Sequence, residues 1–263
     1  GCGVCVGVCP TKAITMAPQE AELGEQEIWN HLVAKVSEKK DMQDNTVKGS
    51  QFKKPLLEFS GSCAGCAETS YARLVTQLFG DRMYISNATG CSSIWGGPAA
   101  TSPYTVNKEG KGPGWANSLF EDNAEHGLGM HLGQKKIRDD LKASVEYVAA
   151  NAKDEELKKA AEDYLATYDD GNANQEPSKR LIALVEAADC DCEACKNIIA
   201  KKDFLNKKST WIFGGDGWAY DIGFGGVDHV LASNKDVNIF VFDTEVYSNT
   251  GGQASKASNI GQV

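Results

Sequence analysis

Histidine, positive charge and long apolar runs are all scarce in this sequence. Only four of its 263 residues are histidines, and none has the partner spacing of a catalytic triad or a zinc site. The net charge is −9, from 27 basic and 36 acidic residues, so nucleic acids and anionic membranes are poor partners. No apolar run approaches the roughly 20 residues of a membrane-spanning helix. We therefore expect neither a nucleic-acid nor a membrane partner.

Several common motifs and terminal features are missing too. There is no Walker loop, no Gly-x-Ser-x-Gly elbow and no signal peptide, and Gly223-x-Gly225-Gly226 is too degenerate for a dinucleotide fingerprint. The chain starts with Gly1, inside a cysteine motif, and ends at Val263 without a terminating element. We expect an internal fragment of a longer protein.

Cysteine, by contrast, is plentiful. An odd number of cysteines in short clusters favours metal ligation over a disulfide framework, and a reducing cytoplasm as the compartment. The nine cysteines are Cys2, Cys5, Cys9, Cys63, Cys66, Cys91, Cys190, Cys192 and Cys195.

The first cysteine run, Cys2-x2-Cys5-x3-Cys9-Pro10, matches the end of the bacterial ferredoxin pattern. In two-cluster ferredoxins the last cysteine of such a run binds the other cluster. We therefore expect Cys2 and Cys5 to bind one [4Fe–4S] cluster and Cys9 to bind its partner. A zinc ribbon half-site, or cysteines without a metal, are the alternatives.

Two further cysteine groups are less specific. Cys63-x2-Cys66, followed by Cys91 in a glycine-rich turn, suits a cubane cluster, a zinc site or a redox dithiol. The group Cys190-x-Cys192-x2-Cys195 lies in a charged helical region. Surface or half-buried cysteines on a helix-rich insertion are the favoured interpretation there, with a metal site as the alternative.

A strand–helix–strand unit is predicted near the end of the chain. Residues 211–217 form a buried strand with a Gly-Asp-Gly tip, 222–233 have helical spacing, and 237–242 form a second strand. The connection makes the strands parallel, so both polar tips meet at one sheet edge. The oxygens available there are those of Asp216, Thr244, the Val246 carbonyl and Asn249.

Such an oxygen cluster suits magnesium, which uses few protein ligands and completes its octahedron with phosphates and water. We therefore predict a site for thiamine diphosphate with Mg²⁺. The alternative is that the Gly-Asp-Gly sequence is a tight turn and nothing more.

The remaining pattern gives the organisation of the chain. We predict an α/β fold in two parts, with residues 1–54 as the end of a ferredoxin-like domain plus a linker, and 55–263 as a cofactor-binding domain. Within the second part, residues 134–208 form an insertion of three or four amphipathic helices. Glycines between 61 and 130 are too frequent for long regular elements. Smaller predictions are a helix at 26–36, a strand at 83–87 and a helix opening at 118–122.

Five segments together resemble one family, the pyruvate:ferredoxin (flavodoxin) oxidoreductases of the long single-chain type. They span nearly the whole chain outside the helical insertion. The segments are GSCAGCAET at 61–69, NATGCSSIWGG at 87–97, GWANSLFEDNAE at 114–125, GGDGWAYDIG at 214–223 and DTEVYSNTGGQ at 243–253.

The resemblance implies a thiamine diphosphate-binding fold, a parallel sheet flanked by helices, and a role for each matched residue. Cys63, Cys66 and Cys91 would bind the cluster nearest the thiamine, with a fourth ligand beyond Val263. Glu68 is the one catalytic residue carried over. The implied magnesium ligands are Asp216, Thr244 and the Val246 carbonyl, and the implied cofactor-binding residues are Glu68, Cys91, Asp216, Gly217, Thr244, Val246 and Asn249.

The implied reaction is the oxidative decarboxylation of pyruvate with coenzyme A to acetyl-CoA and CO₂. Electrons would pass one at a time through [4Fe–4S] clusters to ferredoxin or flavodoxin, in a protein that is a homodimer when intact. The fragment alone should be inactive, because the family's pyruvate-binding residues lie in other domains.

Three alternatives remain open at this point. A related enzyme could use another 2-oxo acid. A non-redox thiamine diphosphate enzyme would explain Asp216 and Asn249 but not the cysteines. A pure electron-transfer or iron–sulfur assembly protein would explain the cysteines but not the magnesium loop.

Overall fold

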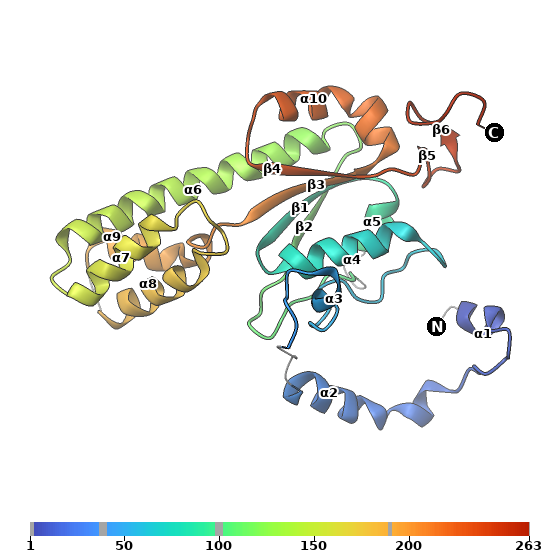
Figure 1. The fold of residues 1–263 in the computed structure, drawn as a ribbon, viewed down its shortest axis with the longest axis horizontal. Helices are drawn as coiled ribbons and strands as arrows, with labels where there is room; N and C mark the ends of the chain where they lie inside the picture. The colour runs from blue at the N-terminus through green and yellow to red at the C-terminus, as the bar shows by residue number, and fades with distance from the viewer. Residues whose placement is uncertain (1–2, 37–40, 98–101, 189–190, 263) are drawn as a thin grey trace.

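A four-stranded parallel sheet forms the centre of the computed structural model, which describes residues 3–36, 41–97, 102–188 and 191–262 (Figure 1). The strand order is β2-β1-β3-β4. The strands are β1 (Met83–Ala88), β2 (Gly114–Ser118), β3 (Ser209–Gly215) and β4 (Val237–Phe242). The predicted α/β fold class is confirmed, and so are the strand predictions at 83–87 and 237–242.

Helices cover both faces of the sheet. Successive residues of each buried strand point to opposite sides, so both faces carry apolar side chains that pack against helices. Phe213 packs with α4 (Ala67–Phe79) and α5 (Cys91–Gly96) through Ala72 and Trp95. Ile212, which precedes Phe213 in β3, packs on the other face with α6 (Asn123–Asn151) and α10 (Phe224–Ala232). Figure 1 shows these two helix pairs on opposite sides of the sheet.

The predicted strand–helix–strand unit is present. A π-helical turn, η4 (Gly217–Ile222), follows β3 and leads through α10 into β4. The two strands pair in parallel, with Gly215 opposite Phe242. Both strands therefore end at the same level, and the loops that follow them share one edge.

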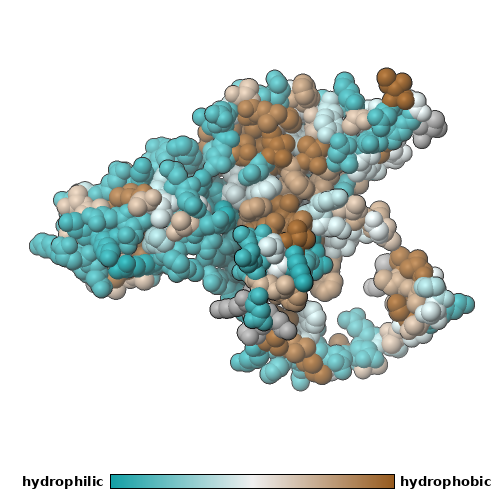
Figure 2. All heavy atoms as spheres, in the orientation of Figure 1, coloured by the Kyte–Doolittle hydropathy of each residue, from teal (hydrophilic) through white to brown (hydrophobic). Residues whose placement is uncertain are grey.

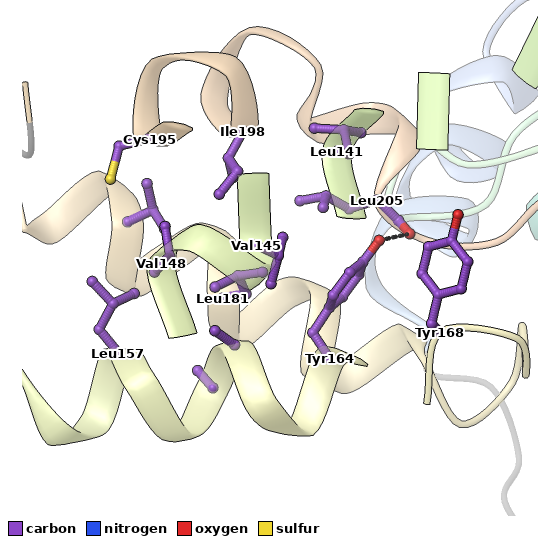
Figure 3. Packing of buried hydrophobic residues seen from close by; sticks show 13 residues of the cluster. Leu141, Val145, Val148, Leu157, Tyr164, Tyr168, Leu181, Cys195, Ile198 and Leu205 are labelled. Atoms are coloured by element: carbon purple, nitrogen blue, oxygen red, sulfur yellow. Dashed lines mark hydrogen bonds between the residues drawn. The ribbon is translucent and has the colours of Figure 1, made fainter. Parts of the chain in front are cut away.

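The predicted helical insertion is also present, although its first helix begins earlier than expected. The far half of α6 packs with α7 (Glu155–Ala166), α8 (Gln175–Ala187) and α9 (Glu193–Ala200) around a separate apolar core (Figure 3). Within this core the buried Tyr164 hydroxyl donates a hydrogen bond to the Leu205 carbonyl at 3.1 Å. The outer surface of this unit is largely hydrophilic (Figure 2).

Two predictions about the glycine-rich stretch were wrong. It carries the 13-residue helix α4 and the start of the 29-residue helix α6. Gly127 shows why: a Cβ there would lie 2.5 Å from Ile212 Cγ1, so this glycine lets the helix approach the sheet. The helix expected to open at 118–122 instead begins at Asn123, whose amide donates to the Phe213 carbonyl at 2.9 Å.

The N-terminal segment runs apart from the sheet (Figure 1). The predicted helix at 26–36 is confirmed as α2 (Glu25–Lys35). The described part of this segment does not show a ferredoxin-like domain, so that assignment stays a prediction. No helix in the described ranges is both long enough and apolar enough to span a membrane. The remaining short elements are α1 (Val4–Val8), η1 (Gln19–Glu22), α3 (Val47–Ser50), η2 (Gly80–Arg82), η3 (Lys202–Phe204), β5 (Val246–Tyr247) and β6 (Gln253–Ala254).

Candidate functional site

A cavity of about 270 Å³ opens at the carboxyl edge of the sheet. Parallel α/β sheets bind ligands at this edge, where the loops after the strands converge. Of the predicted site residues, six line the cavity: Glu68, Cys91, Asp216, Gly217, Val246 and Asn249. The other lining residues are Thr89, Gly90, Ser92, Phe120, Gly215, Phe242, Tyr247, Ser248 and Thr250.

Asp216 is the polar centre of this cavity. Its Oδ2 accepts the Thr244 backbone N–H at 2.9 Å and lies 3.0 Å from Thr244 Oγ1, which is also 3.0 Å from the Val246 carbonyl oxygen. The three predicted magnesium ligands are thus adjacent. The side chain is 2% exposed, and burial raises the pKa of Asp216 above its usual range.

The other carboxylate oxygen of Asp216 is the most informative atom of the site. Oδ1 is buried and accepts no hydrogen bond from the described residues, and the Asp243 carboxylate lies close enough to raise the pKa of Asp216 further. A buried acceptor without a partner costs about 1–3 kcal/mol, and more when it is charged. A cation bound at Oδ1 would remove that cost, so the residues fit a magnesium ion, which prefers oxygen ligands.

Close packing holds the turn after β3 against the cavity wall. A Cβ on Gly217 would lie 2.4 Å from both Phe120 Cζ and Tyr247 Cε1. The two rings are tilted, with their centroids 6.0 Å apart. Only a glycine allows this approach, so Gly217 shapes the cavity directly after Asp216.

Glu68 lies in the first turn of α4 and is 8% exposed. Trp95 Nε1 donates a hydrogen bond to its Oε2 at 2.9 Å. Burial raises the pKa of Glu68, the hydrogen bond from Trp95 opposes that rise, and the charge of Asp216 adds to it. A carboxyl group with a raised pKa, fixed in orientation at a cavity wall, suits proton exchange with a bound group.

Cys91 lies at the first position of α5, on the same cavity. Its Sγ is 3.3 Å from Ser248 Oγ and 3.8 Å from Asn249 Oδ1. Burial raises the pKa of the Cys91 thiol, and nearby Cys66 and Cys63 add to the rise.

The described residues do not contain a cluster of metal-ligating side chains. Across these ranges, no group of three or more His, Cys, Asp or Glu side chains is arranged to hold a metal ion. Cys63 is exposed and Cys66 half-buried. The structure thus brings Cys91 to the cavity, and the cluster role of the three thiols stays a prediction.

The other cysteines lie in two places. Cys5 is exposed and Cys9 half-buried near α1, while Cys2 falls outside the described residues. Cys195 is buried in the core of the helical unit, and its backbone N–H donates to Cys192 Sγ at the start of α9. Cys192 is half-buried, as expected, whereas the expectation of a surface or half-buried Cys195 was wrong because this side chain packs into that core. Cys190 is outside the described residues.

Sequence reasoning missed several residues of the site. Trp95 orients Glu68, Phe120 and Tyr247 form the wall beside Gly217, and Ser248 contacts Cys91. Each lies inside one of the five segments that carry the family resemblance, but none was assigned a role. Nothing in their residue types marked them, because a single tryptophan or serine has no spacing to recognise.

Comparisons with known proteins bear on this site. The chain is 51% identical to a pyruvate-flavodoxin oxidoreductase of Klebsiella pneumoniae and 53% identical to a pyruvate:ferredoxin oxidoreductase of Moorella thermoacetica, in both cases over 100% of its length. It is 46% identical, again over 100%, to a mitochondrial pyruvate dehydrogenase [NADP(+)] of Euglena gracilis. The chain spans 23% of each of the first two relatives and 15% of the third. No protein-family model matches it. The resemblance indicated by the five segments is confirmed.

Proposed function

We propose that this chain, which belongs with the pyruvate:ferredoxin and pyruvate-flavodoxin oxidoreductases by similarity over its whole length, supplies the part of such an enzyme that holds thiamine diphosphate and magnesium. The intact enzyme would decarboxylate pyruvate oxidatively with coenzyme A. The observation that carries the proposal is the buried, unpartnered Asp216 Oδ1 at the carboxyl edge of a parallel sheet.

In this proposal Asp216, Thr244 and the Val246 carbonyl hold Mg²⁺. Asn249 and Ser248, which line the cavity beside them, supply polar groups for the diphosphate. Bound thiamine diphosphate provides an electron sink for the carbon that loses CO₂, which no protein side chain can provide. The protein's part is to fix the cofactor and to exclude water.

Glu68 is the residue we assign to proton exchange. Trp95 holds Oε2, which leaves Oε1 to accept or donate a proton within the cavity. The raised pKa of this buried carboxyl brings its proton affinity closer to neutral pH, where a general acid or base works best.

Cys91 is the cavity residue that we assign to electron transfer. With Cys63 and Cys66 it would bind a [4Fe–4S] cluster, completed by a ligand from elsewhere in the protein. Iron–sulfur clusters transfer single electrons, and the contact of Cys91 with the cavity wall would put that acceptor beside the cofactor. Cys2, Cys5 and Cys9 would belong to further clusters in a domain that ends near residue 54.

The relatives differ in the electron acceptor that their names give. These names include flavodoxin, ferredoxin and NADP(+), although each relative matches this whole chain. We propose ferredoxin or flavodoxin on the basis of the more similar relatives. The acceptor's docking surface would then lie in other domains.

The test is an assay of the intact protein, purified without oxygen and verified to carry iron and thiamine diphosphate. Viologen reduction is followed with coenzyme A present, and pyruvate, 2-oxobutyrate, 2-oxoglutarate or indolepyruvate is supplied in turn. Coenzyme A-dependent reduction with pyruvate is the expected result. Reduction with only another 2-oxo acid would correct the substrate, and no reduction with any would overturn the oxidoreductase proposal in favour of a non-redox thiamine enzyme.

A further inference from the structure

A second cavity lies at the opposite, amino edge of the sheet and has no part in the proposed reaction. Its volume is about 480 Å³, within the range of small-molecule sites. It is bounded by the starts of β1 and β2, by α8 and by the segment that enters β3. Lys208 and Asp216 lie before and after the seven residues of β3, so at a rise of about 3.3 Å per residue the two cavities are roughly 25 Å apart.

Cations dominate the lining of this amino-edge cavity, in a chain whose net charge is −9. The two carboxylates that line it are Asp81 and Asp203. The basic residues that line it are Arg82, Lys111, Lys179, Lys202 and Lys208.

Three of these cations are already paired. Lys111 and Lys179 both reach Glu109, at 3.2 and 3.4 Å, and Lys179 also reaches Glu176 at 3.0 Å. Lys202 reaches Glu186 at 2.9 Å. Pairs at this exposure contribute little stability, and they leave these ammonium groups at the rim of the cavity.

The other two cations are different. Among the described residues, neither Arg82 nor Lys208 has a carboxylate within ion-pair distance, and the Arg82 guanidinium donates instead to the neutral Asn172 Oδ1, at 2.6 Å. Lys208 is half-buried. Burial lowers the pKa of its ammonium group, the charge of Lys111 lowers it further, and Asp203 and Asp81 oppose the shift. A partly desolvated cation without a counter-ion is unfavourable, and a bound anion would stabilise it.

We propose that the amino-edge cavity binds a phosphate-bearing ligand of nucleotide size, with Arg82 and Lys208 as its anion contacts. Arg82 offers a planar fork that suits phosphate oxygens, and lysine binds phosphate as a point charge. The cavity also has an apolar wall, from Tyr84 and Ile182, that suits a base. Arg82 lines a neighbouring polar cavity as well, so a ligand longer than one phosphate has room to extend.

The test is isothermal titration of the intact protein, saturated with thiamine diphosphate and Mg²⁺ so that the first site is filled. The probes are ADP, pyrophosphate and inorganic phosphate, each at two salt concentrations. Saturable binding of ADP that weakens with salt is expected. Lys208→Met removes one of the two anion contacts and should weaken ADP binding at least about tenfold, the loss expected for one hydrogen bond to a charged group.

Two further variants make the result decisive. Lys159→Met removes an exposed lysine of α7 that does not line the cavity, and it should leave the affinity unchanged. Lys208→Arg keeps the charge and should retain most of the binding. No saturable binding of any probe, or equal affinity in the wild type and Lys208→Met, would overturn the proposal. An equal loss in Lys159→Met would do the same, because it would show a diffuse charge effect.

Discussion

Replacing Asp216 by asparagine separates the proposed metal-binding role of this residue from its structural role. Asparagine keeps an oxygen that can accept from the Thr244 N–H and Oγ1, which lie 2.9 and 3.0 Å from Asp216 Oδ2. The substitution removes the negative charge and the acceptor oxygen Oδ1, which accepts no hydrogen bond from the described residues. The substitution therefore removes a ligand without emptying the site.

The expected magnitudes follow from that geometry. An interaction with a charged group contributes about 1.5–3 kcal/mol, which corresponds to a loss of roughly tenfold to 150-fold in Mg²⁺ affinity. In the metal-free protein the change should be neutral or stabilising, because the buried charge that lacks a partner is gone.

The assay is a magnesium titration of thiamine diphosphate binding, followed by the intrinsic fluorescence of the intact protein. Trp95 and Trp218 are buried close to the cavity residues, so cofactor binding should change their emission. Asp228→Asn, on the exposed side of α10, is the matched control. If Asp216→Asn and Asp228→Asn both titrated like the wild type, Asp216 would not be a metal ligand and the proposed function would lose its main support.

The remaining predictions concern the packing and protonation of the same chain. Burial raises the pKa of Glu68 in the folded protein. The ionised Glu68 therefore destabilises the fold as the pH rises above its pKa in the unfolded chain, about 4.3, and the full effect is reached above its pKa in the folded protein. Glu68→Gln should gain stability relative to the wild type across that pH window, measured by urea unfolding at several pH values, while turnover falls. Gly217→Ala places a Cβ 2.4 Å from Phe120 and Tyr247 and should destabilise by about 1–3 kcal/mol, with weaker thiamine diphosphate binding; an unchanged affinity would contradict the shaping role of Gly217. Tyr164→Phe removes the 3.1 Å bond to Leu205 and should cost about 1 kcal/mol without changing cofactor affinity, which tests whether the helical unit is independent of the site.

The sequence predicted the carboxyl edge of the sheet well, for a definite physical reason. Residues 211–217 and 237–242 are apolar runs of strand length with a helix-length connection between them, and right-handed crossovers make such strands parallel. That rule alone brings Asp216 and Thr244 together, and the observed register of Gly215 opposite Phe242 agrees. Local pattern was enough because the unit is continuous in the chain.

Long-range features were beyond the same reasoning. Glycine frequency predicted turns where α6 runs for 29 residues, because composition cannot show that Gly127 is needed for contact with Ile212. The bond from Trp95 to Glu68 joins residues 27 positions apart, through the packing of two helices on one sheet face. Such contacts depend on tertiary packing, which overrides local propensity.

The two edges of the sheet carry buried or half-buried charges of opposite sign, and this contrast favours a different kind of ligand at each edge. At the carboxyl edge, Asp216 is a buried acid with one oxygen that accepts no hydrogen bond from the described residues. At the amino edge, Lys208 is half-buried, burial lowers its pKa, and the charges of Asp203 and Asp81 oppose that shift from beyond ion-pair distance. Folded domains are stable by only about 5–15 kcal/mol, so two uncompensated charges are a substantial cost. Natural sequences tolerate such local conflicts mainly at functional sites. A cation at one edge and a phosphate at the other would each remove one of these costs, and the variants of Asp216 and Lys208 test the two edges independently.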